Sequence, residues 1–181
     1  MARKRFAVAL IVPPPAAIEI DALRQALGDR QLGRIDAHVT IVPPINLDDD
    51  GLIEALIVVE RAASMCPPCS LTLGPVETFS ESAPTRFLRV EPWSPVEQLY
   101  AACWTGPFER PERRSFVPHV TIDIDGGPTE GPDPAVDLLA GFTTACTIDH
   151  VTLLEHRDER DDGSGRGWEP YRRFRLAGPP R

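Results

Sequence analysis

The chain has 181 residues, of which 42% are hydrophobic and 25% are charged. This is enough apolar material for one ordinary core and too much for a disordered chain. No apolar run approaches the ~20 residues of a transmembrane helix, so we expect no membrane association. The formal net charge of −8 excludes a protein that wraps duplex DNA, because such binding depends on neutralising many phosphates. Any nucleic-acid role must be local, at one or two phosphates.

Apolar periodicity predicts strands and helices along the whole chain. Strands are predicted over residues 6–12, 34–42, 70–79, 86–90, 117–124, 143–155 and 171–176. Helices are predicted over residues 16–27, 52–63, 95–104 and 134–142. The first helix ends at Gly28, and acidic residues 48–50 precede the second. Residues 6–12 follow basic residues as in a secretory signal, but the stretch is short and runs into prolines, which favours a buried strand. The order of elements predicts a sheet-based α+β fold.

The four cysteines lie at positions 66, 69, 103 and 146. Cys66 and Cys69 have the spacing of a redox motif, but a strand before them and a helix after them are lacking. A zinc site would need a second close pair, which Cys103 and Cys146 do not provide. We therefore expect buried, reduced thiols in a cytoplasmic protein.

A repeated His-x-Thr tripeptide is the main functional signal. Three of the four histidines are followed two residues later by threonine, in His38-Val39-Thr40, His119-Val120-Thr121 and His150-Val151-Thr152. In a strand, residues i and i+2 point to the same face. Each motif therefore presents an imidazole and a hydroxyl together, while its valine enters the core.

Two such motifs facing one cleft suit in-line displacement at phosphorus. This reaction needs a base on the attacking oxygen and an acid on the leaving oxygen, on opposite sides of the phosphate. Imidazole, with a pKa near ~6.5, is available in either form at neutral pH. Threonine hydroxyls can donate to the non-bridging oxygens, where charge builds up. The pattern predicts acid/base catalysis by two histidines without a metal or cofactor, and leaves open which histidine is the base.

The segments around His38 and His119 resemble the paired motifs of the two-histidine (2H) phosphoesterase superfamily. That superfamily includes the bacterial RNA 2′,3′-cyclic phosphodiesterases, also described as 2′-5′ RNA ligases. Residues 86–91 are similar to the family's strand between the motifs, and residues 148–154 with 171–176 to its closing hairpin. The resemblance implies one bilobal domain over residues 1–181, with two pseudo-symmetric antiparallel-sheet lobes, helices on the outer faces and a central cleft.

Matched motif to motif, the resemblance implies that His38 and His119 are the catalytic pair and that Thr40 and Thr121 bind the phosphate. It implies a metal-independent phosphodiesterase that opens a 2′,3′-cyclic phosphate at a short RNA end or on a small cyclic nucleotide. Run in reverse, the same site joins ends, so weak 2′-5′ ligase activity is chemically permitted. We expect a cytoplasmic monomer.

Other residues are weaker candidates. Phe87 and Arg89 share one face of their strand and are candidates to stack on a base and to pair with a phosphate, with surface packing as the alternative. Asp36 shares the predicted face of His38 and is a candidate to orient its imidazole, with a solvated acid at the strand end as the equal alternative. The third motif, at His150, departs from the family pattern, and we expect it to be non-catalytic, with a role in substrate contact left open.

Three alternatives to this function stay open. One is a module that binds terminal phosphates or RNA without turnover, and another is a hydrolase of a non-nucleotide cyclic phosphodiester. The third is a two-histidine metal site, which lacks a carboxylate at a spacing that guarantees a third ligand.

Overall fold

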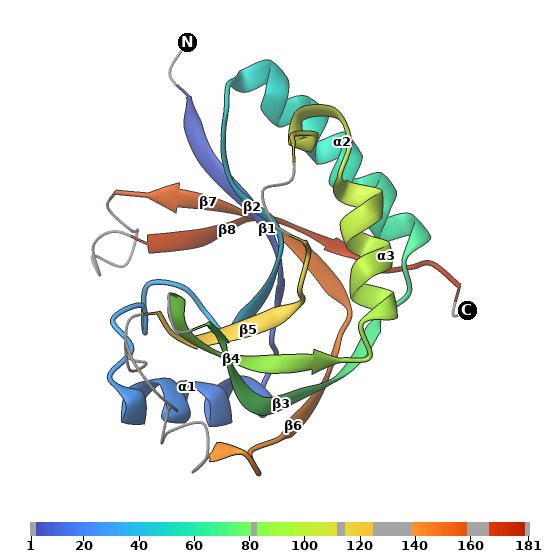
Figure 1. Cartoon of the computed structure of the whole chain (residues 1–181). Coiled ribbons are helices and arrows are strands. Elements are labelled where there is room, and N and C mark those ends of the chain that lie inside the picture. The colour runs from blue at the N-terminus through green and yellow to red at the C-terminus, as the bar shows by residue number, and fades with distance from the viewer. Residues whose placement is uncertain (1–2, 81–82, 112–114, 125–138, 159–166, 180–181) are drawn as a thin grey trace.

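The computed structural model describes residues 3–80, 83–111, 115–124, 139–158 and 167–179. The fold is α+β, as predicted, and is built on one curled antiparallel sheet of eight strands (Figure 1). The strands are β1 (Lys4–Ile11), β2 (His38–Leu47), β3 (Cys69–Ser80), β4 (Ala83–Glu91), β5 (His119–Asp123), β6 (Thr144–Ile148), β7 (His150–Arg157) and β8 (Gly167–Arg175). Their order across the sheet is β6-β3-β4-β5-β2-β1-β7-β8.

The sheet consists of two four-stranded lobes, which confirms the predicted bilobal architecture. One lobe is β6-β3-β4-β5 and the other is β2-β1-β7-β8. The lobes meet where β5 lies beside β2, and within the described residues the register there is the single pair Val39 and Val120. The two lobes are therefore halves of one continuous sheet, joined at the strands that carry the first two histidine motifs.

Within the described residues, three α-helices and a short 3-10 helix pack on the sheet (Figure 1). They are α1 (Ala16–Leu27), α2 (Asp49–Met65), α3 (Ser94–Cys103) and η1 (Gly106–Phe108). Helix α1 packs against β5 and β6, whereas α2 packs against α3 and against β2, β7 and β8. The predicted helix over residues 134–142 lies mainly outside the described residues.

The helix ends follow the sequence signals. Gly28 ends α1 with φ 76°, a left-handed conformation that glycine adopts without strain, and the N–H of Asp29 donates to the carbonyl of Arg24 at 2.9 Å. Asp48 caps α2, because its carboxylate accepts a hydrogen bond from the N–H of Gly51 at 3.0 Å.

Strand β2 starts later and ends later than predicted. The prolines at positions 43 and 44 were expected to end it, but the strand continues to Leu47. Val8 lies opposite Val42 and Phe6 lies opposite Ile45, so β2 has one extra residue between these two pairs. This β-bulge contains the two prolines. A proline lacks an N–H, and at a bulge no ladder hydrogen bond is required of it.

The predicted strand over residues 143–155 is two strands, β6 and β7, divided at Asp149. β6 pairs with β3 at one edge of the sheet, whereas β7 pairs with β1 in the other lobe. The chain thus passes between lobes within one apolar stretch, which periodicity alone does not reveal. The predicted closing hairpin is confirmed, and β8 starts earlier, at Gly167.

The central strand β1 shapes the cleft. Its larger side chains Phe6, Val8 and Leu10 belong to the core cluster. Ala7 and Ala9 alternate with them and line a cavity on the sheet.

Within the described part of the chain, no helix is long and apolar enough to cross a bilayer.

Candidate active site

The first two histidine motifs lie side by side on neighbouring strands and have the same burial pattern. In both, histidine and threonine are half-buried and the residue after each of them is fully buried. Val39 lies opposite Val120, so the register places His38 across from Thr121 and Thr40 across from His119. The two histidines are then diagonal neighbours, with Cβ atoms about 7 Å apart. A phosphate that accepts a hydrogen bond on each flank fits such a gap.

Each imidazole is oriented by the backbone in the same way. Nδ1 of His38 lies 2.8 Å from the carbonyl oxygen of Asp36, and Nδ1 of His119 lies 2.7 Å from that of Val117. A carbonyl oxygen only accepts hydrogen bonds, so Nδ1 must carry the proton in both rings. Nε2 is then the nitrogen that gains and loses a proton in each histidine. The backbone of residue 36, and not the predicted Asp36 carboxylate, orients His38.

Burial lowers the pKa of both histidines below the ordinary value of 6.5. For His38, the hydrogen bond to Asp36 opposes this effect, and the positive charges of Arg24 and His119 lower the pKa further. For His119, the hydrogen bond to Val117 opposes the lowering. The charge of His119 is felt at His38, so the two imidazoles form an interacting pair.

The third motif has a different environment. His150 is half-buried, as the first two histidines are, but its Nδ1 contacts the Asp149 carboxylate at 2.8 Å instead of a backbone carbonyl. Thr152 is 1% exposed and lies opposite Ala9, so its hydroxyl is closed off from solvent. His150 thus does not line the cavity that His38 lines, and its imidazole is not oriented in the way that those of His38 and His119 are.

A cavity of about 200 Å³ lies over the first motif. His38, Thr40 and Thr121 line it. His119 is not among the lining residues, and its ring lies against those of Phe79 and Phe87. The cavity extends over β1, β7 and β8, where Leu154 and Trp168 contribute to the wall.

Arg24 of α1 forms part of the same wall and was missed from the sequence. Its side chain is 3% exposed, and its Nε donates to Asp29 at 2.8 Å. Its Nη1 donates to Asp21 at 2.9 Å and to the carbonyl of Ile35 at 3.0 Å. The guanidinium thus fastens the segment before β2 to α1. Arg24 is four residues after Ile20 and next to Leu23, so it lies on the apolar face of the helix. This position is the sequence signal that could have identified it.

A second buried ion pair lies just beyond the Thr121 motif. Asp123 of β5 and Arg86 of β4 are almost fully buried and are 2.9 Å apart. They are opposite each other in the register, next to a bulge between Arg86 and Phe87. Asp123 thus fastens β5 to β4, immediately beside the residues that form the site.

Phe87 and Arg89 lie opposite Thr121 and His119, on the face predicted for them, and both side chains already contact other residues. Phe87 is 4% exposed and is stacked against Phe79, with ring centroids 4.2 Å apart. The Arg89 guanidinium is paired with Glu91 at 2.9 Å and with Glu77 at 3.6 Å. Both contacts raise the pKa of Arg89, that of Glu91 more strongly. A phosphate would therefore compete with these two carboxylates for the exposed Arg89 guanidinium.

Phe79 is the accessible ring on this side. It is 40% exposed, and its centroid is 4.8 Å from that of His119, with the rings nearly perpendicular. The sequence signal was an aromatic residue at the end of a strand, before a polar turn.

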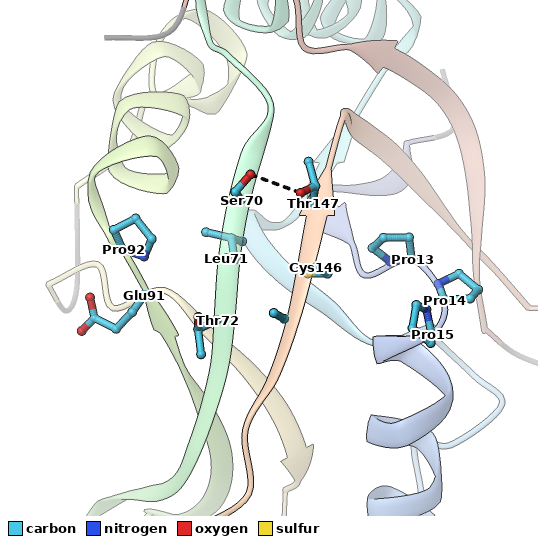
Figure 2. Close-up of a pocket in the computed structure, with 11 residues that line it drawn as sticks. Pro13, Pro14, Pro15, Ser70, Leu71, Thr72, Glu91, Pro92, Cys146 and Thr147 are labelled. Carbon is cyan, nitrogen blue, oxygen red and sulfur yellow. Dashed lines mark hydrogen bonds between the residues drawn. The ribbon is translucent and has the colours of Figure 1, made fainter.

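A larger and more open groove of about 650 Å³ lies elsewhere on the molecule (Figure 2). Prolines 13–15 form one side of it, and the paired strands β3 and β6 form another, with a hydrogen bond of 3.1 Å between Ser70 and Thr147. None of the predicted site residues lines it. Its carboxylate, Glu91, is paired with Arg89, so the groove contains no acid/base pair.

The cysteines do not form a further site in the described part of the chain. Cys66, Cys69 and Cys103 are buried, and burial raises the pKa of Cys69 to about 11 and that of Cys103 to about 12. Cys66 follows a helix and Cys69 starts a strand, the reverse of the order that a redox motif needs. Among the described residues, no group of three or more histidine, cysteine or acidic side chains is arranged to hold a metal ion.

Comparison with known proteins identifies relatives in sequence. The family model described as "2'-5' RNA ligase superfamily" matches residues 12–160. A protein of Halalkalibacterium halodurans, provisionally named a phosphoesterase, is 31% identical over 146 residues, which cover 79% of this chain and 81% of the relative. A protein of Oceanobacillus iheyensis with the same provisional name is 25% identical, over 96% of this chain and 98% of its own length.

Solved structures resemble the fold over almost the whole chain. E. coli LigT in complex with 3′-AMP has a TM-score of 0.68 at 16% identity, and covers 97% of this chain with 99% of its own. The apo form of E. coli LigT has a TM-score of 0.69 at 18% identity, with the same coverage. At this level of identity the similarity is evidence for the fold alone.

Proposed function

The chain belongs to the 2′-5′ RNA ligase superfamily, also called the two-histidine phosphoesterases, and we propose that it is a phosphodiesterase that opens 2′,3′-cyclic phosphates. In this proposal His38 and His119 are the acid/base pair, and Thr40 and Thr121 hold the phosphate. The substrate is a short RNA end or a small cyclic nucleotide.

The observation that carries the proposal is the matched environment of the two imidazoles. Each Nδ1 contacts the carbonyl oxygen two residues earlier, at 2.8 Å for His38 and 2.7 Å for His119. This fixes Nε2 as the working nitrogen in both. Because Val39 lies opposite Val120, the rings are diagonal neighbours on adjacent strands. A structural histidine needs no such duplicate, whereas a two-sided proton transfer does.

The reaction removes one proton from the attacking water and delivers one proton to the leaving ribose oxygen. One Nε2, unprotonated, takes a proton from a water molecule as the water oxygen bonds to phosphorus. The other Nε2, protonated, gives its proton to the ribose oxygen as the bond from phosphorus to that oxygen breaks. The products are a phosphate monoester and a free hydroxyl. After turnover the two rings have exchanged protonation states, and exchange with solvent restores them.

The threonines act on the charge that builds up on the non-bridging oxygens. Thr40 and Thr121 line the cavity with His38, and each shares a strand face with one of the histidines. Their hydroxyls are suited to donate to those oxygens as the charge develops. Binding of an anion also favours protonation of an adjacent imidazole, which offsets the lowering of its pKa by burial.

A nucleotide substrate is supported by the structural relatives. E. coli LigT has been solved with 3′-AMP and with phosphate, and the same architecture covers nearly all of this chain. A 3′-nucleotide is one of the two monoesters that opening of a 2′,3′-cyclic phosphate can yield.

The test is hydrolysis of 2′,3′-cyclic AMP in the presence of a metal chelator. We expect the wild type to turn over, and His38→Ala and His119→Ala each to lower kcat by about 10²–10⁴-fold. His150→Ala is the matched control, since it removes the imidazole of the third motif, which does not line the cavity, and it should retain wild-type activity.

Other outcomes would select another function. Binding of the nucleotide without turnover in the wild type would indicate a phosphate-recognition module. Loss of activity in chelator, restored by a metal ion, would replace the two-histidine mechanism. Turnover of a non-nucleotide cyclic phosphodiester with none of 2′,3′-cyclic AMP would retain the mechanism and change the substrate class.

A further inference from the structure

Trp168 is an aromatic side chain to which the proposed catalysis gives no role. It lies near the start of β8, is half-buried, and lines the same cavity as His38 and Thr40. β8 is three strands from β2 in the sheet order. The cavity therefore extends from the first histidine motif across β1 and β7 to the indole.

The indole is held in place before any ligand binds. His156 lies opposite Trp168 in the register of β7 and β8, and the two rings meet edge to face, with centroids 5.1 Å apart at 78°. The backbone N–H of Trp168 donates to the carbonyl of Arg34 at 2.8 Å. An aromatic ring that is fixed in advance loses little entropy when a ligand stacks on it.

The cavity changes in chemistry along its length. Near β2 and β5 the hydroxyls of Thr40 and Thr121 face it, while β1 and β7 contribute Ala7, Ala9 and Leu154. The two alanines are small, so the floor between the hydroxyls and the indole stays open. A nucleotide has the same order of groups, with an anionic phosphate at one end and a flat base at the other, and bases stack on aromatic side chains.

We propose that Trp168 is the base-stacking platform of the site, for a nucleotide whose phosphate lies between His38 and His119. This inference rests on the proposed function and adds to it that the site recognises the base as well as the phosphate. Phe79 is the competing ring, since it is 40% exposed beside His119. It lies on the other lobe, however, and does not line the cavity that His38 shares with Trp168.

Kinetics with and without a base test this proposal. For 2′,3′-cyclic AMP, we expect Trp168→Leu to raise KM by about 10-fold or more, with kcat within about threefold of the wild type. For ribose 2′,3′-cyclic phosphate, which lacks a base, the same variant should match the wild type. Trp168→Phe keeps an aromatic face and should recover most of the loss. Trp104→Phe, at a tryptophan that does not line the cavity, is the control and should behave as the wild type.

Fluorescence tests the native side chain directly, without dependence on the folding of a Trp168 variant. In the double variant Trp93→Phe, Trp104→Phe, Trp168 is the only tryptophan left among the three in the chain. We expect 3′-AMP to quench its emission and inorganic phosphate to leave it unchanged.

The two proposals fail separately. Equal effects of Trp168→Leu on both substrates, or a base-dependent KM effect in Phe79→Leu instead, would overturn the assignment of Trp168 and leave the catalytic pair intact. If the wild type hydrolyses neither substrate but 3′-AMP quenches Trp168, the base platform is supported and the catalytic proposal falls. Absence of quenching at saturating 3′-AMP overturns the platform.

Discussion

Val39 of β2 lies directly opposite Val120 of β5, and this register pair joins the two lobes of the sheet. Both side chains are fully buried. A slip of one residue in this register would turn the histidines and threonines into the core and the valines into the cleft. The buried pair therefore fixes both the junction of the lobes and the relative position of His38 and His119.

Removal of a threonine hydroxyl should lower the rate more than the binding affinity. We expect Thr40→Val and Thr121→Val each to lower kcat for 2′,3′-cyclic AMP by about 10²-fold, the scale of losing one donor to a developing oxyanion. Thr40→Ser and Thr121→Ser keep the donor and should recover most of the rate. Thr147→Val, on the exposed face of β6, is the control. A rise in KM at unchanged kcat would show that the hydroxyls bind the ground state and the transition state equally.

The dependence of activity on pH should reflect the lowered pKa of both histidines. Catalysis needs one imidazole neutral and the other protonated, so kcat/KM should follow a bell-shaped curve. Both pKa values are below 6.5 in the free protein, so the maximum should lie on the acid side of 6.5. Bound phosphodiester favours the protonated form, so the curve for kcat should lie at higher pH. A flat profile between pH 5 and 8, or a maximum of kcat/KM above pH 7, would contradict the pairing.

Much of the fold and the central part of the site could be predicted from the sequence. The spacing of His38 from Thr40, and of His119 from Thr121, fixes the face of each strand because side chains alternate with a period of two. This alternation does not show which strands pair with each other. The division of residues 143–155 at Asp149 into strands of the two lobes was therefore missed. The bulge that lets β2 continue past Pro43 and Pro44 also depends on a partner strand.

The residues that were predicted less well depend on tertiary contacts. For Phe87 and Arg89 the sequence left open a choice between ligand contact and surface packing. In the structure Phe79 from β3 stacks on the Phe87 ring, and Glu77 and Glu91 reach the Arg89 guanidinium. The sequence predicted no role for Trp168, because its place in the cavity comes from pairing with β7 and from the hydrogen bond of its backbone N–H to the carbonyl of Arg34. None of these contacts leaves a local pattern in the sequence.

The buried histidines should make the protein less stable in acid. Each folded-state pKa is lowered from 6.5, so between the folded and unfolded values the unfolded chain binds more protons. The contribution of the neutral, buried histidines to the free energy of unfolding is therefore complete above about pH 6.5, and it is lost as pH falls toward the folded pKa values. The free energy of unfolding of the wild type should thus fall more between pH 7.5 and 5.5 than that of the double variant His38→Gln, His119→Gln. Urea denaturation at both values measures this difference, and parallel curves would contradict it.

Asp123→Asn should be the most damaging of the single polar substitutions near the site. The change leaves the Arg86 guanidinium without its carboxylate at 2.9 Å in an almost fully buried place. The cost of breaking a buried pair in this way is about 3–5 kcal/mol of unfolding free energy, measured by chemical denaturation.

The double variant Arg86→Met, Asp123→Leu separates the loss of the whole pair from the loss of the carboxylate alone beside a buried guanidinium. Two apolar side chains of similar size remove both charges, so this variant should recover most of the stability lost in Asp123→Asn. Glu91→Gln is the matched control, because it breaks the exposed pair with Arg89, where solvent already screens the charges, and its unfolding curve should overlay that of the wild type. A double variant no more stable than Asp123→Asn would mean that shape and hydrogen bonding at this junction of β4 and β5 matter more than the buried guanidinium charge.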